Sequence, residues 1–214
     1  MKHLIKMALM ILTWTGFAGV SSAQPGLGAD IVSRYVWRGT DFGNSASVQP
    51  SLSHTIGPVE IGAWGSYALT AAGAGFNEND LFIAWSAGPI ILTVTDYFYP
   101  EGFDIFNYSD KDAVHILEGS ASVSFGSASV LGAFNFSGDP DHSFYAELGW
   151  DLGEKEGVAM SIAAGIGNHV YVKRTGGDPA LVSVSVTACK GPLSVSWILN
   201  PDAKTDFLVF GYHF

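Results

Sequence analysis

The feature of this sequence that most limits its fold is a repeated alternation of apolar side chains with small or polar ones. The alternation is clearest in residues 143–152, where the even positions from Phe144 to Leu152 are all apolar and the odd positions include Glu147 and Asp151. A period of two residues places these two sets on opposite faces of a β-strand. Segments of this kind recur along the chain, so we expect an all-β protein.

Twelve segments follow the pattern, and short and long connections alternate between them. The short connections mostly pair Gly with Pro or Ser, which favour tight turns, whereas the long ones are more polar. Short turns at one end of a sheet and longer loops at the other are typical of transmembrane barrels. We therefore predict a transmembrane antiparallel up-and-down β-barrel of about 12 strands. The predicted strands are 29–38, 46–56, 59–69, 80–87, 90–98, 113–125, 128–136, 143–152, 158–167, 181–188, 193–199 and 206–214.

Composition favours a barrel that faces lipid. The chain is 48% hydrophobic and only 14% charged, yet no run of 18 apolar residues follows the N-terminal region. A barrel in a membrane needs apolar residues at only every second position, because its other face lines the lumen. A soluble β-sandwich would share the alternation, but it would not turn apolar side chains outward while Ser, Gly and Glu point inward.

The first residues are typical of a secretory signal peptide. Lys2 and Lys6 precede an apolar stretch from Met7 to Val20, and small residues lead to a cut after Ala23. We therefore expect a cleaved signal peptide at 1–23, a single barrel domain at 24–214 and localisation to the bacterial outer membrane. With 20 acidic side chains against 10 basic ones, the chain does not suit nucleic acid as a partner.

The last predicted strand carries large apolar groups on one face, including Phe210, Tyr212 and Phe214. A strand of this type, ending in Phe, resembles the closing strand of bacterial outer-membrane barrels. The resemblance implies that these three residues form a signal for the barrel-assembly machinery. Outer-membrane lipid and lipopolysaccharide are the other expected partners.

Three stretches of the first third of the mature chain resemble the opening strands of a known family. They are residues 30–39 (DIVSRYVWRG), 49–53 (QPSLS) and 59–66 (VEIGAWGS). Together they resemble the TorF family of bacterial porins, a family of largely unknown function. The resemblance implies an outer-membrane location and a channel, with no catalytic residues to carry over.

We predict a pore constriction formed by Arg34 on one wall and by Glu118 with Glu147 on the other. In a twelve-stranded barrel, Arg34 points inward from the first strand, and the two acids point inward from the sixth and eighth. Strand seven lies opposite strand one, so the acids flank the position that faces the arginine. Two acids against one base would favour cations weakly. The alternative is a set of lumen charges that neutralise one another and fill the barrel.

Other candidate chemistry is weaker. Asp139, His142 and Ser143 could suggest part of a metal site or a hydrolase, but neighbours in sequence rarely form a catalytic triad, and Asp and Pro are ordinary turn residues. The acidic loop from Glu101 to Asp112 could bind Ca²⁺ or Mg²⁺ shared with lipopolysaccharide phosphates, although a solvated loop is the simpler explanation. We expect no enzyme activity, metal or cofactor. The leading hypothesis is a porin-like channel for small hydrophilic solutes or ions. The alternatives are a structural or adhesive barrel with a filled lumen and, least favoured, an outer-membrane hydrolase.

Overall fold

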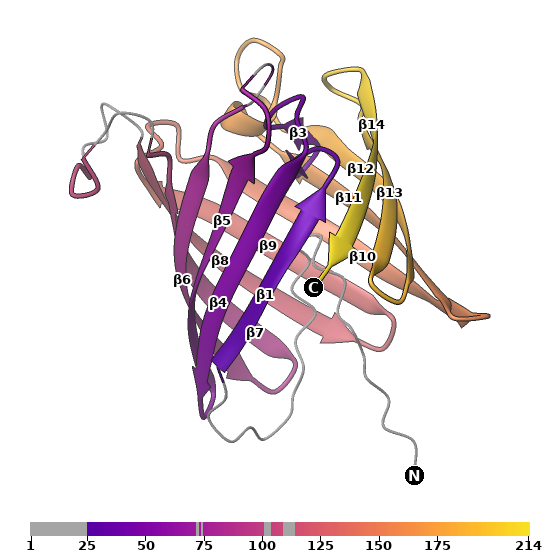
Figure 1. Ribbon diagram of the computed structural model, residues 1–214. Helices are drawn as coiled ribbons and strands as arrows, with labels where there is room; N and C mark the ends of the chain where they lie inside the picture. The colour runs from indigo at the N-terminus through magenta and orange to yellow at the C-terminus, as the bar shows by residue number, and fades with distance from the viewer. Residues whose placement is uncertain (1–24, 72, 74, 101–103, 109–113) are drawn as a thin grey trace.

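The computed structural model describes residues 25–71, 73, 75–100, 104–108 and 114–214, so the predicted signal peptide and most of the acidic loop lie outside the described residues. Twelve antiparallel strands close into one barrel, which confirms the predicted fold class (Figure 1). The barrel strands are β1 (Pro25–Val32), β4 (Ser47–Ile56), β5 (Val59–Ala68), β6 (Glu78–Ala87), β7 (Ile90–Phe98), β8 (His115–Phe125), β9 (Ala128–Ser137), β10 (Phe144–Lys155), β11 (Val158–Gly167), β12 (Ala180–Lys190), β13 (Leu193–Asn200) and β14 (Thr205–His213).

The two faces of the barrel differ as the alternation predicts. On β10, Leu148 and Trp150 are about half exposed on the outside, whereas Tyr145 is 1% exposed on the lumen side. Outward apolar residues recur on the other barrel strands, and buried inward positions include Ser196, Thr187 and Asn135. An outer apolar band around a polar interior is the arrangement of a transmembrane β-barrel. No helix among the described residues is long and apolar enough to cross a membrane.

Tight turns join the strands at one end, which we call the short-turn end. Gly57, Gly88, Gly126 and Gly191 have φ of 57–63°, a left-handed conformation that glycine adopts without steric strain. At the remaining turn, Glu156 and Gly157 both have positive φ, as a two-residue type I′ hairpin requires. Strand β10 therefore continues to Lys155, three residues beyond its predicted end. A register shift between Asp151 and Gly153 accommodates this extension.

The first strand differs most from its prediction. Residues 29–38 were expected to cross the membrane, but β1 spans Pro25–Val32 and pairs with β4 over that whole length. The chain then leaves the wall at the long-loop end and turns into the lumen. There it forms a small hairpin from β2 (Val36–Trp37) and β3 (Thr40–Asp41). Figure 1 shows β3 within the upper end of the barrel. The alternation of Tyr35 and Trp37 continues that of β1, but their rings meet the lumen wall instead of lipid.

The barrel closes through an unusually short seam between β1 and β14. Only Asp30, Ile31 and Val32 pair with His213, Tyr212 and Gly211. By contrast, β1 pairs with β4 at eight positions. Further hydrogen bonds join Ser33 to Phe210 and Phe214 to Ala29. In Figure 1 the two strands are staggered, so that β14 extends above the end of β1 and β1 extends below the C-terminus. Side chains at the seam therefore contribute more to closure than those between fully paired strands.

Candidate functional site

Residues 33–46 form a plug inside the long-loop end of the lumen. The hairpin tip is fitted against the opposite wall, because a Cβ on Gly39 would lie only 1.9 Å from the carbonyl oxygen of Val182. The φ of Gly39 is 76°, and Asn200 donates a hydrogen bond to its carbonyl oxygen at 3.1 Å. Glycine is therefore needed there for both space and conformation. The tip fixes the position of the preceding residue, Arg38.

Arg38 is the central charged group of the plug. Its guanidinium donates two hydrogen bonds to the Glu118 carboxylate on β8, at 2.5 and 2.9 Å. The two side chains are 8% and 3% exposed, so this ion pair is buried in the lumen. Burial by itself lowers the pKa of Arg38, but Glu118 outweighs it and the pKa lies well above its ordinary value. Arg38 is therefore a permanent cation, and its neutralisation depends on Glu118.

Aromatic side chains surround this ion pair. The Arg38 guanidinium lies 4.3 Å from the Trp37 ring centre and 4.5 Å from that of Tyr145, distances typical of cation–π contacts. It also donates to the Tyr171 hydroxyl at 2.6 Å, and the Tyr97 hydroxyl donates to Glu118 at 3.1 Å. Burial raises the pKa of Tyr171 to about 12, so its hydroxyl stays protonated.

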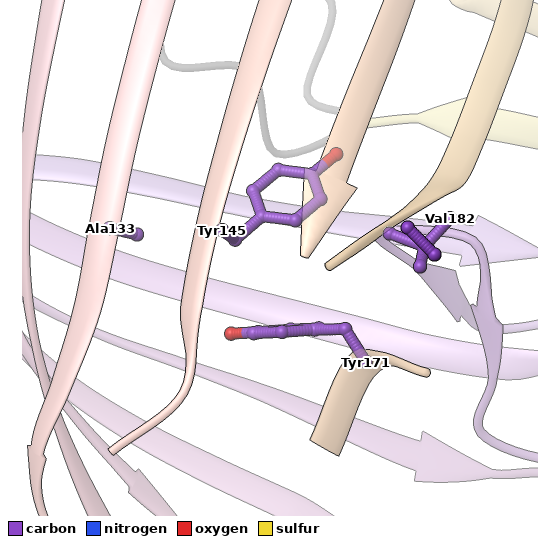
Figure 2. Close-up of a cluster of buried hydrophobic side chains, with 5 residues drawn as sticks. Ala133, Tyr145, Tyr171 and Val182 are labelled. Carbon is purple, nitrogen blue, oxygen red and sulfur yellow. The ribbon is translucent and has the colours of Figure 1, made fainter. Parts of the chain in front are cut away.

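The rings of Tyr145 and Tyr171 also belong to the buried apolar cluster of the lumen. Figure 2 shows the rings of Tyr145 and Tyr171 one above the other, with Val182 on a neighbouring wall strand. Their ring centres are 5.5 Å apart. Tyr171 comes from a 3₁₀ turn (His169–Tyr171) in the β11–β12 loop, so a second loop segment enters the lumen beside the plug. Ala133 and Ala180 complete the buried cluster.

A second polar cluster holds the other side of the plug. The buried acids Glu78 and Asp80 point into the lumen from β6, where Glu78 lies close to the hydroxyls of Tyr35 and Tyr99. Burial, and then the charge of Glu78, raises the pKa of Tyr35 well above its ordinary value. The phenol therefore remains a hydrogen-bond donor. Glu78 was not predicted as a lumen residue, because it lies two residues before the predicted start of this strand.

The structure brings together two of the three residues predicted to form a constriction. Glu118 and Glu147 both face the lumen near Arg38, and Glu147 accepts a hydrogen bond from Tyr145 at 2.6 Å. Arg34 pairs with neither acid and does not lie on a wall strand, although it lines a smaller cavity together with Glu147. It pairs with Asp41 at 3.2 Å, bonds to Asn44 and lies over the Phe207 ring. Arg34 was expected to point inward from the first strand, but that strand, β1, ends at Val32, where the chain leaves the wall.

Arg38 was present in the predicted first strand but was not selected. The following Gly39, a residue that weakens strands, was the available signal that the strand had already ended. Pairing with the far wall is a long-range contact that no local pattern indicates. The cation opposite the two acids is therefore Arg38, supplied by the plug and not by the wall.

Below the plug, the lumen contains a cavity of about 340 Å³ that we call the vestibule. Arg38, Glu118 and Glu147 line its upper end. Its walls combine small hydroxyl side chains with apolar ones such as Trp64, Phe82 and Leu131, and Glu60 and Asp80 also line them. The hydroxyl-bearing residues are Ser51, Ser53, Thr93, Thr95, Ser120, Ser122 and Ser129. A smaller cavity of about 90 Å³ separates the plug from β12–β14.

The sequence cluster at Asp139, His142 and Ser143 is a loop cap and does not form a catalytic relay. The Asp139 carboxylate accepts bonds from the Ser143 backbone amide at 2.8 Å and from Asn135 at 2.9 Å. His142 instead faces the Asn135 carbonyl oxygen. Within the described part of the chain, no three His, Cys, Asp or Glu side chains are arranged to hold a metal ion.

This loop cap should weaken on acidification. Burial alone would raise the pKa of Asp139, but the hydrogen bonds from Ser143 and Asn135 outweigh it and lower the pKa. A carboxylate with a lowered pKa contributes stability above about pH 4, the ordinary value of aspartate, and loses it as pH falls further. We expect amide exchange at Ser143 to accelerate below about pH 4. In Asp139→Asn the exchange should be faster at neutral pH and nearly independent of pH between 3 and 6, after correction for intrinsic exchange. An unchanged profile would contradict this role.

The residues predicted to signal assembly lie on the outer face of the closing strand. Phe210 and Tyr212 are about half exposed and Phe214 is 73% exposed. The rings of Tyr212 and Phe214 are 4.7 Å apart. Their recognition by the assembly machinery remains a prediction.

No protein-family model and no curated protein matches this sequence significantly. The resemblance to the TorF porins therefore also remains a prediction, and function has to be argued from the lumen.

Proposed function

We propose that this protein is a bacterial outer-membrane channel for small hydrophilic solutes or ions, with a low resting conductance that the plug sets. The observation that carries the proposal is the vestibule, a cavity in the lumen that is lined in part by seven Ser and Thr hydroxyls and by four acidic side chains, and that ends at one buried ion pair. Hydroxyl side chains can replace part of the water shell of a solute, as the lining of a selective pore must.

The orientation follows from the lengths of the connections. In outer-membrane barrels the short turns face the periplasm and the longer loops face the exterior. The plug would then close the external end, and the vestibule would lie on the periplasmic side. In this proposal the signal peptide directs export of the chain. The assembly machinery and lipopolysaccharide are then its partners during insertion into the outer membrane. Fractionation with the outer membrane and a heat-dependent shift in gel mobility would support the location, whereas recovery as a soluble periplasmic protein would exclude it.

The plug itself favours one competing function, a structural barrel with a filled lumen. Arg38, Glu118 and four aromatic rings occupy the upper lumen without a through passage being required. The two proposals differ in one measurable property. A channel shows discrete, solute-dependent currents in a planar bilayer, and a structural barrel shows none at any applied voltage.

Charge selectivity tests which groups line the path. Because Arg38 neutralises Glu118, a weak cation preference should come from the other acids that line the vestibule, Glu60, Asp80 and Glu147. In a KCl gradient, Glu147→Gln should move the reversal potential towards zero. Adding Glu118→Gln should leave the Arg38 cation unpaired and shift the selectivity further towards anions. Lys204→Gln, an exposed change at the long-loop end, serves as the control and should leave selectivity unchanged. If neither Glu147→Gln nor the double variant with Glu118→Gln alters the selectivity, the ion path lies elsewhere.

A further inference from the structure

Three polar side chains converge at the seam of the barrel from three neighbouring strands. His213 on β14 lies between Asp30 on β1 and Ser194 on β13. Its Nδ1 is 2.8 Å from Asp30 Oδ1, and its Nε2 is 3.1 Å from Ser194 Oγ. Both distances lie in the hydrogen-bonding range expected of a nucleophile, its base and the group that orients the base. Asp30, Ser194 and His213 are far apart in sequence, unlike the Asp139 cluster.

Strand register explains why the groups meet. Asp30 and His213 are directly opposite each other in the β1–β14 pair, and Ser194 is opposite Gly211 in the β13–β14 pair. Residues 211 and 213 lie on the same face of β14, which points into the lumen. The imidazole therefore extends from β14 with one nitrogen towards each neighbouring strand.

The acceptors around the ring determine the direction of the relay. An Asp30 carboxylate only accepts, so the Nδ1–H of a neutral imidazole donates to it. Nε2 is then free of hydrogen and accepts the bond from the Ser194 hydroxyl. This is the tautomer in which a histidine can remove the proton of a serine that attacks a carbonyl group.

Gly211 provides the space that the nucleophile needs. A Cβ at this position would lie 2.4 Å from Ser194 Oγ, closer than two such atoms can approach. Its backbone is ordinary extended strand, so alanine would be tolerated by the backbone but would displace the hydroxyl from His213. Gly211 is therefore a positioning residue for the serine.

The group lies at the lumen face of the seam, next to the vestibule. Ser194 is the second residue of β13 after the Gly191 turn, whereas Asp30 lies two residues before β1 ends at the long-loop end, so β1 and β14 are staggered at the seam. Gly28, on the same inward face of β1 as Asp30, lines the vestibule, and a Cβ there would lie 3.9 Å from the backbone oxygen of Phe214, the residue after His213. The side chains of Asp30 and His213 are 14% and 16% exposed, and Ser194 is 6% exposed. A small molecule that reaches the vestibule wall at Gly28 would therefore lie beside the seam.

We propose that Ser194, His213 and Asp30 form an acyl-transfer site for small carboxylic esters that reach this part of the seam from the vestibule. Ser194 Oγ bonds to the ester carbonyl carbon while its proton passes to His213 Nε2. The C–O bond to the alcohol then breaks, and the alcohol leaves with that proton. Water hydrolyses the acyl-serine by the same route, which regenerates Ser194 and releases the carboxylic acid. Asp30 orients the imidazole and stabilises its protonated form.

The wall around Ser194 consists of paired strands, whose backbone amides are engaged in the sheet. Stabilisation of an oxyanion must therefore come from side chains or water, and loss of one fixed donor alone lowers turnover by about 10²–10³-fold. Turnover should accordingly be slow. Covalent capture of the serine by an alkyl fluorophosphonate is the better test, because it reports activation of the nucleophile: Ser194 Oγ bonds to phosphorus, fluoride leaves and His213 takes the proton.

The experiment uses the full barrel refolded in detergent, with folding verified for every variant by heat-dependent gel mobility. Mass spectrometry should find one adduct, on Ser194, in the wild type. His213→Gln and Gly211→Ala should each slow labelling about a hundredfold or more, the usual contribution of a positioned base. Ser196→Ala is the matched control, since Ser196 lies on the same inward face but pairs with Thr187, and it should label as the wild type does.

The competing explanation is a purely structural clasp that closes the short seam. In that case the folded wild type would show no adduct, or Ser194 would label no faster in the wild type than in His213→Gln, and the proposal would be overturned. An adduct confined to another serine would overturn it equally. Because labelling requires no ion current, its outcome is independent of whether the barrel conducts.

Discussion

Replacement of the plug by a two-residue turn should raise the conductance of the barrel at least about tenfold, because it opens the upper end of the lumen. A twelve-stranded barrel lies between the filled eight-stranded and the open sixteen-stranded sizes, so its lumen can hold a narrow pore once the plug is gone. The replacement is feasible without strain. Val32 and Ser47, which flank the plug, are paired in the β1–β4 register. An Asn-Gly turn can therefore join the two strands directly in place of residues 33–46. Single-channel recording in a planar bilayer measures the effect.

The matched control removes residues 174–176, which are exposed in another long loop. That variant should conduct like the wild type, because it leaves the plug and Tyr171 in place. If the variant without the plug folds and still carries no current, the lumen is closed by its wall and the proposed channel is wrong. If the wild type already conducts as freely as this variant, the plug does not limit passage.

Breaking the Arg38–Glu118 pair should have the second large effect. Removal of one partner of a buried ion pair leaves an uncompensated charge and typically costs about 3–5 kcal/mol. Arg38→Met or Glu118→Leu should therefore undock the plug. Hydrogen exchange of the plug amides should accelerate about 10²-fold or more, since each 1.4 kcal/mol corresponds to a factor of ten. Replacing both residues together should restore much of the protection, because an apolar pair of similar volume replaces the charges.

Arg34 supplies the control for that experiment within the same segment. Its ion pair with Asp41 is partly exposed, with side chains 26% and 31% exposed, and such pairs contribute at most about 1 kcal/mol. Arg34→Gln should therefore change exchange in the plug by less than about tenfold. If the changes at Arg34 and Arg38 accelerate exchange of the plug amides equally, the buried pair of Arg38 and Glu118 does not hold the plug more strongly than the exposed one. Additive effects of the two changes at Arg38 and Glu118 would show that the two residues do not act as a pair.

The alternation of side chains was sufficient to predict the barrel wall. From Ile90 to Phe98 the predicted limits equal those of β7, and the short turns at Gly57, Gly88, Gly126 and Gly191 fall where Gly and Pro or Ser indicated them. These features are local, because strand faces and turn conformations depend on residues adjacent in the chain. Glu118 and Glu147 were placed inside the lumen by the same argument.

The ends of strands were less accurately predicted. Strand β10 extends to Lys155 through a register shift, because the pairing with β11 continues past Asp151. The first strand failed for the opposite reason. Its alternation from Ile31 to Trp37 is continuous in sequence, but pairing with β4 ends at Val32. Alternation alone does not distinguish an aromatic ring that meets lipid from one that meets the inside of the barrel.

By itself, the sequence determined the fold class, the twelve strands of the barrel wall, the inward face of most of them and the two acids of the lumen. Only the tertiary structure decided that residues 33–46 fold inward, that Arg38 and not Arg34 meets Glu118, and that Asp30, Ser194 and His213 meet at the seam. The physical reason is range. Periodicity and turn chemistry act between residues close in the chain, whereas partners across a lumen or a seam are set by the closure of the whole barrel.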